Sequence, residues 1–390
     1  MIDRDLSDRF RRVASKFPAV TLTGPRQSGK STLCRALFPD HRYVSLEAPD
    51  ARDFARDDPR AFLAQFDGGA VLDEVQRVPE LPSYLQGLID EQPTPGRWIM
   101  TGSQNFGLIE SISQSLAGRS AVLHLLPLAR SEVARFDAFP GSLDGSLATG
   151  GYPRIFDLEL DPADWLGSYV ATYVERDVRT ITNVGDLATF QRFVELCAGR
   201  TGQLLNYSAL AADCGITQPT AKAWLAVLEA SFIVHRLPAF HANLRKRLVK
   251  MPKLHFYDSG LACWLLGIRS PEHLRAHPLR GAIFESWVVS EILKHRLNRG
   301  ESAGLTFYRD RDGVEADLVI ESPDRLRFVE VKAAQTPRGN LLDGANRVRA
   351  RLEQTGKPVE SIVIYGGAEE QRRSAGELLP WNRIQDRDWL

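Results

Sequence analysis

Residues 24–31 read GPRQSGKS, and this stretch decides the fold of the first part of the chain. Two glycines bracket a short loop that ends in lysine and serine, which is the spacing of a phosphate-binding loop between a strand and a helix. Glycines let successive backbone N–H groups turn inward, and the following helix adds the positive end of its dipole. The flanks agree, because residues 19–23 form an apolar run typical of a buried strand and residues 32–37 continue as a helix.

The polar positions of this loop have expected tasks at a bound nucleotide. Lys30 is expected to reach the β- and γ-phosphates and to act in catalysis, and the Ser31 hydroxyl is expected to bind Mg²⁺. ATP with Mg²⁺ is therefore the predicted ligand. The residues predicted to bind it from the loop are Gly24, Pro25, Arg26, Gln27, Ser28, Gly29, Lys30, Ser31 and Thr32.

A second acidic site follows the apolar run at residues 70–72, which reads as another buried strand. In a parallel sheet its end lies beside the phosphate loop, so Asp73 is expected to hold Mg²⁺ through its water shell. Glu74 then points to the other side of the strand end, where it is expected to orient and deprotonate the attacking water. The alternative is a surface strand that merely ends in acidic residues.

Small polar residues follow the strand expected at residues 97–101. They reach the carboxyl end of the sheet, where open α/β folds bind ligands. Ser103 or Asn105 is therefore expected to sense the γ-phosphate, and capping of the next helix is an equal alternative.

Arg119 lies between a helix expected at residues 108–116 and a strand expected at 121–125. This position favours projection toward a neighbouring subunit, as an arginine finger that stabilises charge on that subunit's γ-phosphate. An ordinary surface salt bridge is the alternative. The first interpretation requires an oligomer for efficient hydrolysis.

The loop, the acidic strand end, the TGS turn at residues 101–103 and the AGR phrase at 117–119 occur in this order, and together they resemble an AAA+ ATPase. The phrases SLAGR, LLPLARSE, GGYPRIF, YVERDV and FYDSGLACWLLG resemble more narrowly a bacterial and archaeal group of AAA+ ATPases with a C-terminal domain of unknown function. This resemblance spans essentially the whole chain. It implies an α/β fold with a P-loop parallel sheet over residues 1–130, and a homo-oligomeric ring such as a hexamer.

The middle of the chain reads as two further domains. Residues 131–187 are mainly helical by periodicity and are expected to form a lid or connector. Residues 188–260 have a helix-turn-helix outline followed by two strands, which predicts a winged helix. Its wing carries the basic residues expected to contact DNA phosphates, although such a run is often only a solvated face or part of a protein connector. These residues are Arg245, Lys246, Arg247 and Lys250.

Residues 261–390 combine a long helix with an Asp and an ExK on consecutive strands. Residues two apart on a strand share a face, so Glu330 and Lys332 point alike, with Asp317 on the preceding strand. This pattern resembles the PD-(D/E)xK nucleases, which implies a restriction-endonuclease-like fold with Asp317, Glu330 and Lys332 as catalytic residues. Asp317 and Glu330 would hold Mg²⁺, and Glu285 would add a ligand from the helix. An ion-pair ladder on a half-exposed hairpin would produce the same letters.

Composition sets the outer limits. The 390 residues carry a formal net charge of +0, so any contact with nucleic acid must come from a local basic patch. Four cysteines without a CxxC pair argue against zinc, residues 1–12 lack the apolar core that a signal peptide is expected to have, and the sequence contains no run of 18 apolar residues. We therefore expect a cytoplasmic protein that binds no membrane.

The sequence thus predicts an Mg²⁺-dependent ATPase coupled to DNA binding and to metal-dependent DNA cleavage, with branched DNA as one candidate substrate. The alternative is a nucleotide-dependent switch or scaffold whose nuclease-like domain binds a protein partner without cutting.

Overall fold

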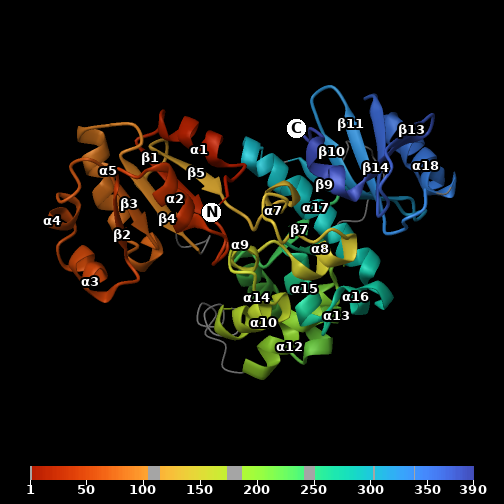
Figure 1. Cartoon of the computed structure of the whole chain (residues 1–390), viewed down its shortest axis with the longest axis horizontal. Coiled ribbons are helices and arrows are strands. Elements are labelled where there is room, and N and C mark those ends of the chain that lie inside the picture. Colours follow the sequence, from red (N-terminus) through yellow and green to blue (C-terminus); the bar gives the residue numbers. More distant parts are fainter. Residues whose placement is uncertain (1, 104–114, 174–186, 241–250, 302–303, 338) are drawn as a thin grey trace. The chain divides into compact units, whose positions relative to one another are not determined.

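The computed structural model describes residues 2–103, 115–173, 187–240, 251–301, 304–337 and 339–390. The chain forms two compact units, each with its own hydrophobic core (Figure 1). Unit 1 consists of Met1–Leu128, Ala230–Phe232 and Leu297–Gly300, and unit 2 of Ala129–Glu229, Ile233–Arg296 and Glu301–Leu390.

Unit 1 is built on a five-stranded sheet in the order β2-β3-β4-β1-β5, and every pairing is parallel. β1, β3 and β4 are buried along their whole length, as strands covered on both faces are. This confirms the predicted parallel α/β sheet. The strands are β1 (Ala19–Thr23), β2 (Arg42–Ser45), β3 (Ala70–Asp73), β4 (Trp98–Gly102) and β5 (Ser120–His124).

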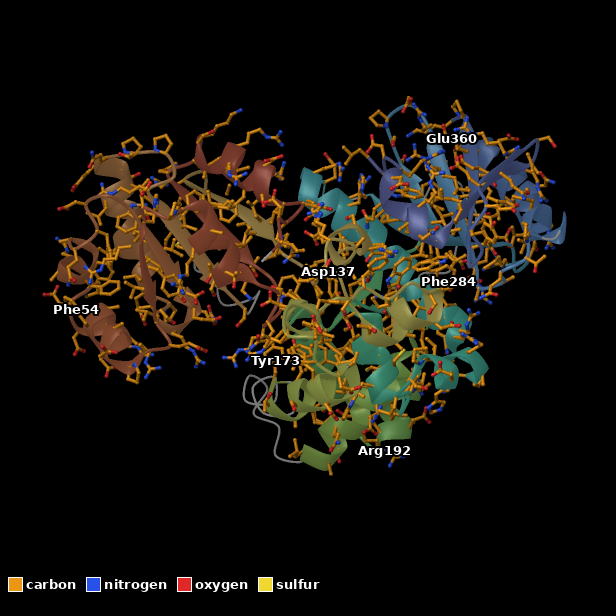
Figure 2. The ribbon with its side chains drawn as sticks, viewed as in Figure 1. Phe54, Asp137, Tyr173, Arg192, Phe284 and Glu360 are labelled. Carbon is orange, nitrogen blue, oxygen red and sulfur yellow. The ribbon has the colours of Figure 1, made fainter. Side chains whose placement is uncertain are left out.

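Helices cover this sheet. Helix α2, which follows the phosphate loop, packs against β3 and β4, and α1 packs against α2 and β1. Phe54 of α3 contacts the Phe62 ring of α4 edge-on and remains partly exposed at the rim of the unit (Figure 2). The predicted helix at 108–116 and Asn105 lie outside the described residues, except for the helix's last two positions. The helical segments are α1 (Ser7–Ala14), α2 (Lys30–Leu37), α3 (Pro49–Asp57), α4 (Pro59–Leu63), η1 (Val75–Arg77) and α5 (Leu81–Glu91).

Unit 2 begins with helices and a small antiparallel sheet in the order β6-β8-β7. A helix-turn-helix forms where expected, and Gly215 ends its first helix with a φ of 74°. The winged helix itself stays a prediction, because Arg245, Lys246, Arg247 and Lys250 lie outside the described residues. The elements are α7 (Arg130–Val133), α8 (Leu143–Thr149), α9 (Pro153–Asp157), α10 (Pro162–Tyr169), α12 (Leu187–Ala198), β6 (Gln203–Leu204), α13 (Tyr207–Cys214), α14 (Gln218–Ala230), β7 (Val234–Leu237) and β8 (Lys253–Phe256).

The phrases GGYPRIF and FYDSGLACWLLG meet in unit 2. The Asp258 carboxylate accepts hydrogen bonds from the backbone N–H groups of Gly151, at 2.7 Å, and Leu261, at 2.9 Å. It thereby caps α15 (Ser259–Leu265) and ties this helix to the turn after α8. A Cβ atom on Gly150 would lie 2.3 Å from an Asp258 oxygen, so this turn requires a glycine. Each of these two hydrogen bonds crosses one of the predicted domain boundaries, which stay predictions.

The rest of unit 2 is a mixed six-stranded sheet in the order β13-β14-β12-β11-β10-β9. β10 runs antiparallel to β9 and β11, and β12 runs parallel to β11 and β14. The strands are β9 (Leu305–Arg309), β10 (Glu315–Glu321), β11 (Leu326–Lys332), β12 (Val359–Tyr365), β13 (Gln371–Arg373) and β14 (Gly376–Pro380). The helical segments are α15, α16 (Pro271–Ala276), α17 (Arg280–Arg299), η3 (Gly339–Leu342), α18 (Asp343–Leu352), η4 (Glu353–Thr355) and η5 (Trp381–Asp386).

Helix α17 is buried along much of its length, and its residues up to Arg296 belong to unit 2. Phe284 and Trp287 project from it into a core that also contains Phe307 of β9, and Phe284 lies inside the unit in Figure 2. Glu285, on the same helix, lines a pocket together with Asp317 of β10.

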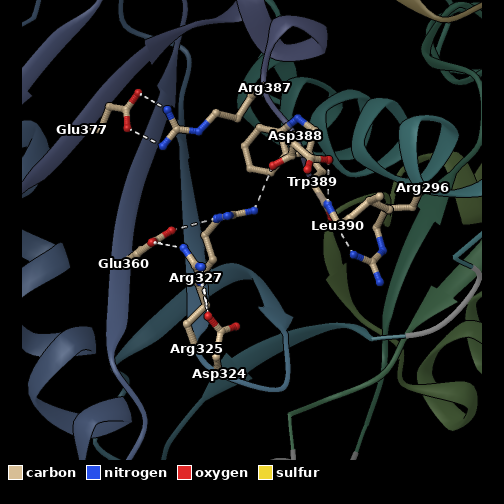
Figure 3. Close-up of polar contacts among 10 residues, drawn as sticks. All are labelled: Arg296, Asp324, Arg325, Arg327, Glu360, Glu377, Arg387, Asp388, Trp389 and Leu390. Carbon is tan, nitrogen blue, oxygen red and sulfur yellow. Dashed lines mark hydrogen bonds and ion pairs between the residues drawn. The ribbon is translucent and has the colours of Figure 1, made fainter. Parts of the chain in front are cut away.

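Hydrogen bonds connect the C-terminal residues to the rest of unit 2 (Figure 3). The Arg296 guanidinium of α17 donates to the Trp389 carbonyl at 2.6 Å, and Arg327 donates to the Asp388 carbonyl at 3.0 Å. Arg387 forms a bidentate ion pair with Glu377 of β14, with N–O distances of 2.8 and 2.6 Å.

Candidate nucleotide site and a charged pocket

The phosphate loop joins β1 to α2 through backbone conformations that favour glycine. Gly24 has a φ of 153°, and a Cβ atom there would lie 2.1 Å from the Leu125 carbonyl oxygen. Gly29 has a φ of 93° and directly precedes α2 as its N-cap residue. No larger residue fits Gly24, so the close approach of the loop to Leu125 explains why the motif starts with glycine.

Lys30 is buried within its own loop. Its ammonium donates hydrogen bonds to the carbonyl oxygens of Gly24, at 3.0 Å, and Pro25, at 2.8 Å. Burial lowers the pKa of Lys30 to about 8, and the carboxylates of Glu74 and Asp73 offset only part of that effect. The side chain is thus folded back onto the place where phosphate oxygens would be held.

The Asp73 carboxylate, at the end of β3, accepts hydrogen bonds from three hydroxyl groups. Ser31 donates to its two oxygens at 3.0 and 2.9 Å, and Tyr43 donates at 2.6 Å. Thr101 also donates to this carboxylate. Tyr43 and Thr101 lie on β2 and β4, the two neighbours of β3, so only the lateral strand order reveals them.

Glu74 adopts a left-handed conformation, with φ 58° and ψ 46°, directly after β3. Residues other than glycine rarely hold this conformation, and when they do they are often found at functional sites. Ser103 donates to the Glu74 carboxylate at 3.1 Å, and the Gln76 amide also donates to it. Burial raises the pKa of Glu74 above its ordinary value, and the Lys30 charge offsets part of this rise.

These residues fit a phosphate with Mg²⁺. Ser31 and Asp73 bring hydroxyl and carboxylate oxygens within hydrogen-bonding distance, and such oxygens are the ligands that Mg²⁺ prefers. Arg26 pairs instead with Glu47 at 2.8 Å, and the side chains of Gln27 and Thr32 are exposed.

Arg4 supports the loop from a part of the chain that we did not single out from the sequence. Its guanidinium donates to the Ser28 carbonyl at 2.8 Å and to the Leu126 carbonyl at 2.9 Å. The side chain is buried, so one residue links the phosphate loop to the chain that follows β5. No local sequence pattern around Arg4 predicts that it binds the phosphate loop.

Arg119 forms a bidentate ion pair with Asp90 of α5 in its own chain, with N–O distances of 2.5 and 2.9 Å. The pairing raises the pKa of Arg119 and lowers that of Asp90. This is the salt bridge named as the alternative, and the finger role stays a prediction that requires this pair to open.

In unit 2, Asp317, Glu330 and Lys332 line one pocket of about 580 Å³, together with Glu285. Leu318 pairs with Val329 across β10 and β11, which sets Asp317 opposite Glu330. Asp317 accepts the Val331 N–H at 2.8 Å, and the Lys332 ammonium lies 2.5 Å from Glu330. Burial and the Asp317 charge raise the pKa of Glu330 to about 7.

Lys253, the first residue of β8, lies among these carboxylates, and sequence reasoning did not find it. Its Nζ lies 2.8 Å from Glu285, 3.4 Å from Asp317 and 2.6 Å from Glu315. Burial lowers the pKa of Lys253, but the three carboxylates more than offset this and raise it above its ordinary value.

The acidic residues of this pocket do not form the expected metal site. Within the described part of the chain, no group of three or more His, Cys, Asp or Glu residues is placed to hold a metal ion. Glu285, Asp317 and Glu330 are brought together as predicted, but Lys253 stands between two of them. These residues therefore do not fit the ion that the nuclease resemblance implies.

Three protein families match consecutive parts of the chain. The AAA domain family matches residues 16–134, a domain of unknown function (DUF8612) matches 141–272, and another (DUF4143) matches 280–384. Among the described helices, none is long and apolar enough to cross a membrane.

Two curated relatives come from mycobacteria, and both carry the name of an uncharacterized protein. They are Rv2008c of Mycobacterium tuberculosis and Mb2031c of Mycobacterium bovis, each 32% identical over 337 residues, which cover 86% of this chain and 74% of theirs.

Solved structures are more distant. The Walker-type ATPase PABY2304 of Pyrococcus abyssi is 14% identical, with 68% of this chain and 96% of that chain covered at a TM-score of 0.45. A single-residue variant of Thermotoga maritima RuvB is 16% identical, with 61% and 90% covered at a TM-score of 0.32.

Proposed function

We propose that this chain, which belongs to the family of the mycobacterial proteins Rv2008c and Mb2031c, is an ATP hydrolase that uses Glu74 as its general base. Residues 16–134 form an AAA+ P-loop ATPase domain, and such domains bind nucleotide, usually with Mg²⁺. The observation that carries the proposal is the contact of the Ser31 hydroxyl with the Asp73 carboxylate, with Glu74 one residue further on.

The chain's own groups divide the work of hydrolysis. On nucleotide binding, Lys30 exchanges the carbonyls of Gly24 and Pro25 for phosphate oxygens, because those oxygens carry full charge. Ser31 and Asp73 would hold Mg²⁺, which would offset the negative charge of the phosphates. Glu74 is a stronger base than an exposed glutamate because burial raises its pKa, and it takes a proton from the attacking water.

Two substitutions test this assignment. Glu74→Gln should leave nucleotide binding intact and lower ATP turnover by about 10²- to 10⁴-fold, the range for a lost general base. Lys30→Ala should remove binding itself. Normal ATP turnover in either purified variant would overturn the assignment.

DNA is the partner that we propose for this ATPase. The energy of ATP hydrolysis would be used to process it. The support is the pair of cations Arg309 and Lys332, which line the unit 2 pocket of about 580 Å³ beside Asp317 and Glu330. Cations of this kind bind phosphodiester groups, and carboxylates opposed across two strands are the basis of the cleavage hypothesis.

A non-cutting switch or scaffold is the second candidate for unit 2, and Lys253 favours it. An ammonium among Glu285, Glu315 and Asp317 leaves the pocket without the free carboxylates that metal-dependent cleavage needs. A screen of single-stranded, duplex and branched DNA for stimulation of ATP turnover separates the two. Stimulation by one form supports DNA as the substrate, and no stimulation by any form supports the protein-partner switch.

We propose in addition that the active form is a homo-oligomer in which Arg119 leaves Asp90 to reach the nucleotide of a neighbouring subunit. Asp90→Ala should then preserve or raise ATP turnover, whereas Arg119→Ala should lower it without weakening nucleotide binding. Equal turnover of the Arg119→Ala variant and the unchanged protein would contradict this role.

A further inference from the structure

Lys253 is placed as a cation inside an acidic pocket. Its side chain is 3% exposed, and its Nζ contacts Glu315 at 2.6 Å, Glu285 at 2.8 Å and Asp317 at 3.4 Å. The ammonium also lies 5.5 Å from the centre of the Phe307 ring, within reach of a cation–π contact. Carboxylates from α17 and β10 thus converge on one positive charge that belongs to β8.

A divalent cation bound to these carboxylates would need the same space. Mg²⁺ and Ca²⁺ bind carboxylate oxygens at about 2.0 to 2.6 Å, so an ion shared by Glu285 and Asp317 would overlap the ammonium that already bridges them. Two positive charges at such a distance also repel each other strongly in a partly buried site. We propose that Lys253 is the resident cation of this pocket and excludes divalent metal ions from it.

The charges that line the pocket agree with this role. By formal charge, with every group ionised, Glu285, Glu315, Asp317 and Glu330 supply four negative charges, and Lys253, Arg309 and Lys332 supply three positive ones, which leaves −1. Without Lys253 the balance becomes −2, which one divalent ion neutralises. Lys332 pairs with Glu330 at 2.5 Å, and Arg309 pairs with Glu315 at 3.5 Å. Lys253 is the cation that forms ion pairs with Glu285 and Asp317.

This inference rests on the proposed role of the unit 2 pocket in DNA processing and deepens it. While Lys253 stays in place, the pocket engages its partner with Lys332 and Arg309 and does not perform metal-dependent cleavage.

Titration of the full-length, nucleotide-free protein with Mn²⁺ tests the exclusion directly. Lys253→Met should gain one Mn²⁺ site that depends on Asp317, because the positive charge that repels the ion has been removed. Its affinity for Mn²⁺ should be at least about tenfold higher than that of any Asp317-dependent site in the unchanged protein. Lys253→Met/Asp317→Asn should lose the gain, and Lys253→Arg, which keeps the charge, should not show it. Mn²⁺ should also raise the unfolding temperature of Lys253→Met more than that of Lys253→Arg.

Two results would overturn the proposal. One is a folded Lys253→Met protein that binds Mn²⁺ no better than the unchanged chain. The other is the loss of an Mn²⁺ site in the Asp317→Asn variant of the otherwise unchanged protein. This second result can be obtained even when Lys253→Met does not fold. Identical Mn²⁺ titrations of the unchanged and Asp317→Asn proteins support the exclusion.

DNA cleavage assays separate this inference from the proposed function. If Lys253→Met gains the Mn²⁺ site but cuts no DNA, the exclusion stands and the cleavage hypothesis fails. If the unchanged protein cuts DNA with Mg²⁺ and loses this activity in Asp317→Asn, the exclusion fails and the cleavage hypothesis stands.

Discussion

The Arg4 guanidinium donates a 2.8 Å hydrogen bond to the carbonyl oxygen of Ser28, in the middle of the phosphate loop. The same side chain donates to the Leu126 carbonyl at 2.9 Å, so the loop is attached to the end of the sheet through a buried charge. A loop that presents its N–H groups to phosphate needs partners for its carbonyl groups, and Arg4 supplies one for the carbonyl of Ser28.

Arg4→Ala should therefore weaken nucleotide binding although Arg4 lies outside the motif. Loss of a hydrogen bond from a charged group costs about 1.5 to 3 kcal/mol, which corresponds to a roughly 10- to 150-fold increase in the Kd for ADP. Arg11→Ala is the matched control, because Arg11 is exposed and pairs with the exposed Asp8 at 3.3 Å. Equal ADP affinities for the two variants would show that Arg4 has no part in holding the loop.

Nucleotide affinity should fall as the pH rises above about 8. Burial lowers the pKa of Lys30 to about 8 in the free protein, against the attraction of Glu74 and Asp73. Only the ammonium form attracts phosphate, so each pH unit above that value should cost up to about tenfold in affinity, with uptake of a proton on binding. Calorimetric titration with ADP between pH 7 and pH 10, in buffers of different ionisation enthalpy, measures both effects. A flat profile over this range would contradict them.

The acid side of the pH profile for ATP turnover should report Glu74. Its pKa is raised above 4.5, mainly by burial, and the base acts only when it is deprotonated. Turnover should therefore decline as the pH falls through this raised pKa, while the residual rate of Glu74→Gln should show no such decline. Both profiles are measured at saturating ATP and Mg²⁺, and parallel profiles would exclude Glu74 as the group that titrates.

Gly150→Ala should destabilise unit 2. A Cβ at this position would lie 2.3 Å from the Asp258 carboxylate and would also require a φ of 74°, which is costly for alanine. Displacement of Asp258 would release its hydrogen bonds to Gly151 and Leu261, so we expect a loss of about 2 to 5 kcal/mol, as for other broken buried networks. Gly141→Ala is the control, because a Cβ there meets no atom within 4 Å. Denaturant unfolding compares the two, and equal midpoints would refute the expectation.

Local patterns were enough to place three strands of unit 1 and the phosphate loop. The apolar runs before residues 24, 73 and 102 became β1, β3 and β4, because a buried parallel strand needs continuous apolar residues and leaves its polar residues at its carboxyl end. The Asp and ExK pattern likewise put Asp317 and Glu330 opposite each other, since alternation along paired strands fixes which side chains share a face.

Partners distant in sequence were not accessible in this way. Tyr43 reaches Asp73 from the next strand, Arg4 reaches Ser28 across 24 positions and Lys253 reaches Asp317 across 64. One interpretation of the sequence placed Arg119 at a neighbouring subunit. The structure shows instead that the Arg119 guanidinium donates a hydrogen bond to Asp90 of α5 in the same chain.

The sequence by itself determined a P-loop ATPase domain, because a phosphate loop, its flanking strand and its helix are contiguous and follow from local backbone and burial requirements. Only the tertiary structure decided which charges meet: it brought the lysine that begins β8 between carboxylates of α17 and β10. Electrostatic pairing depends on distance in space and on burial, and neither is written in the spacing of residues along a chain.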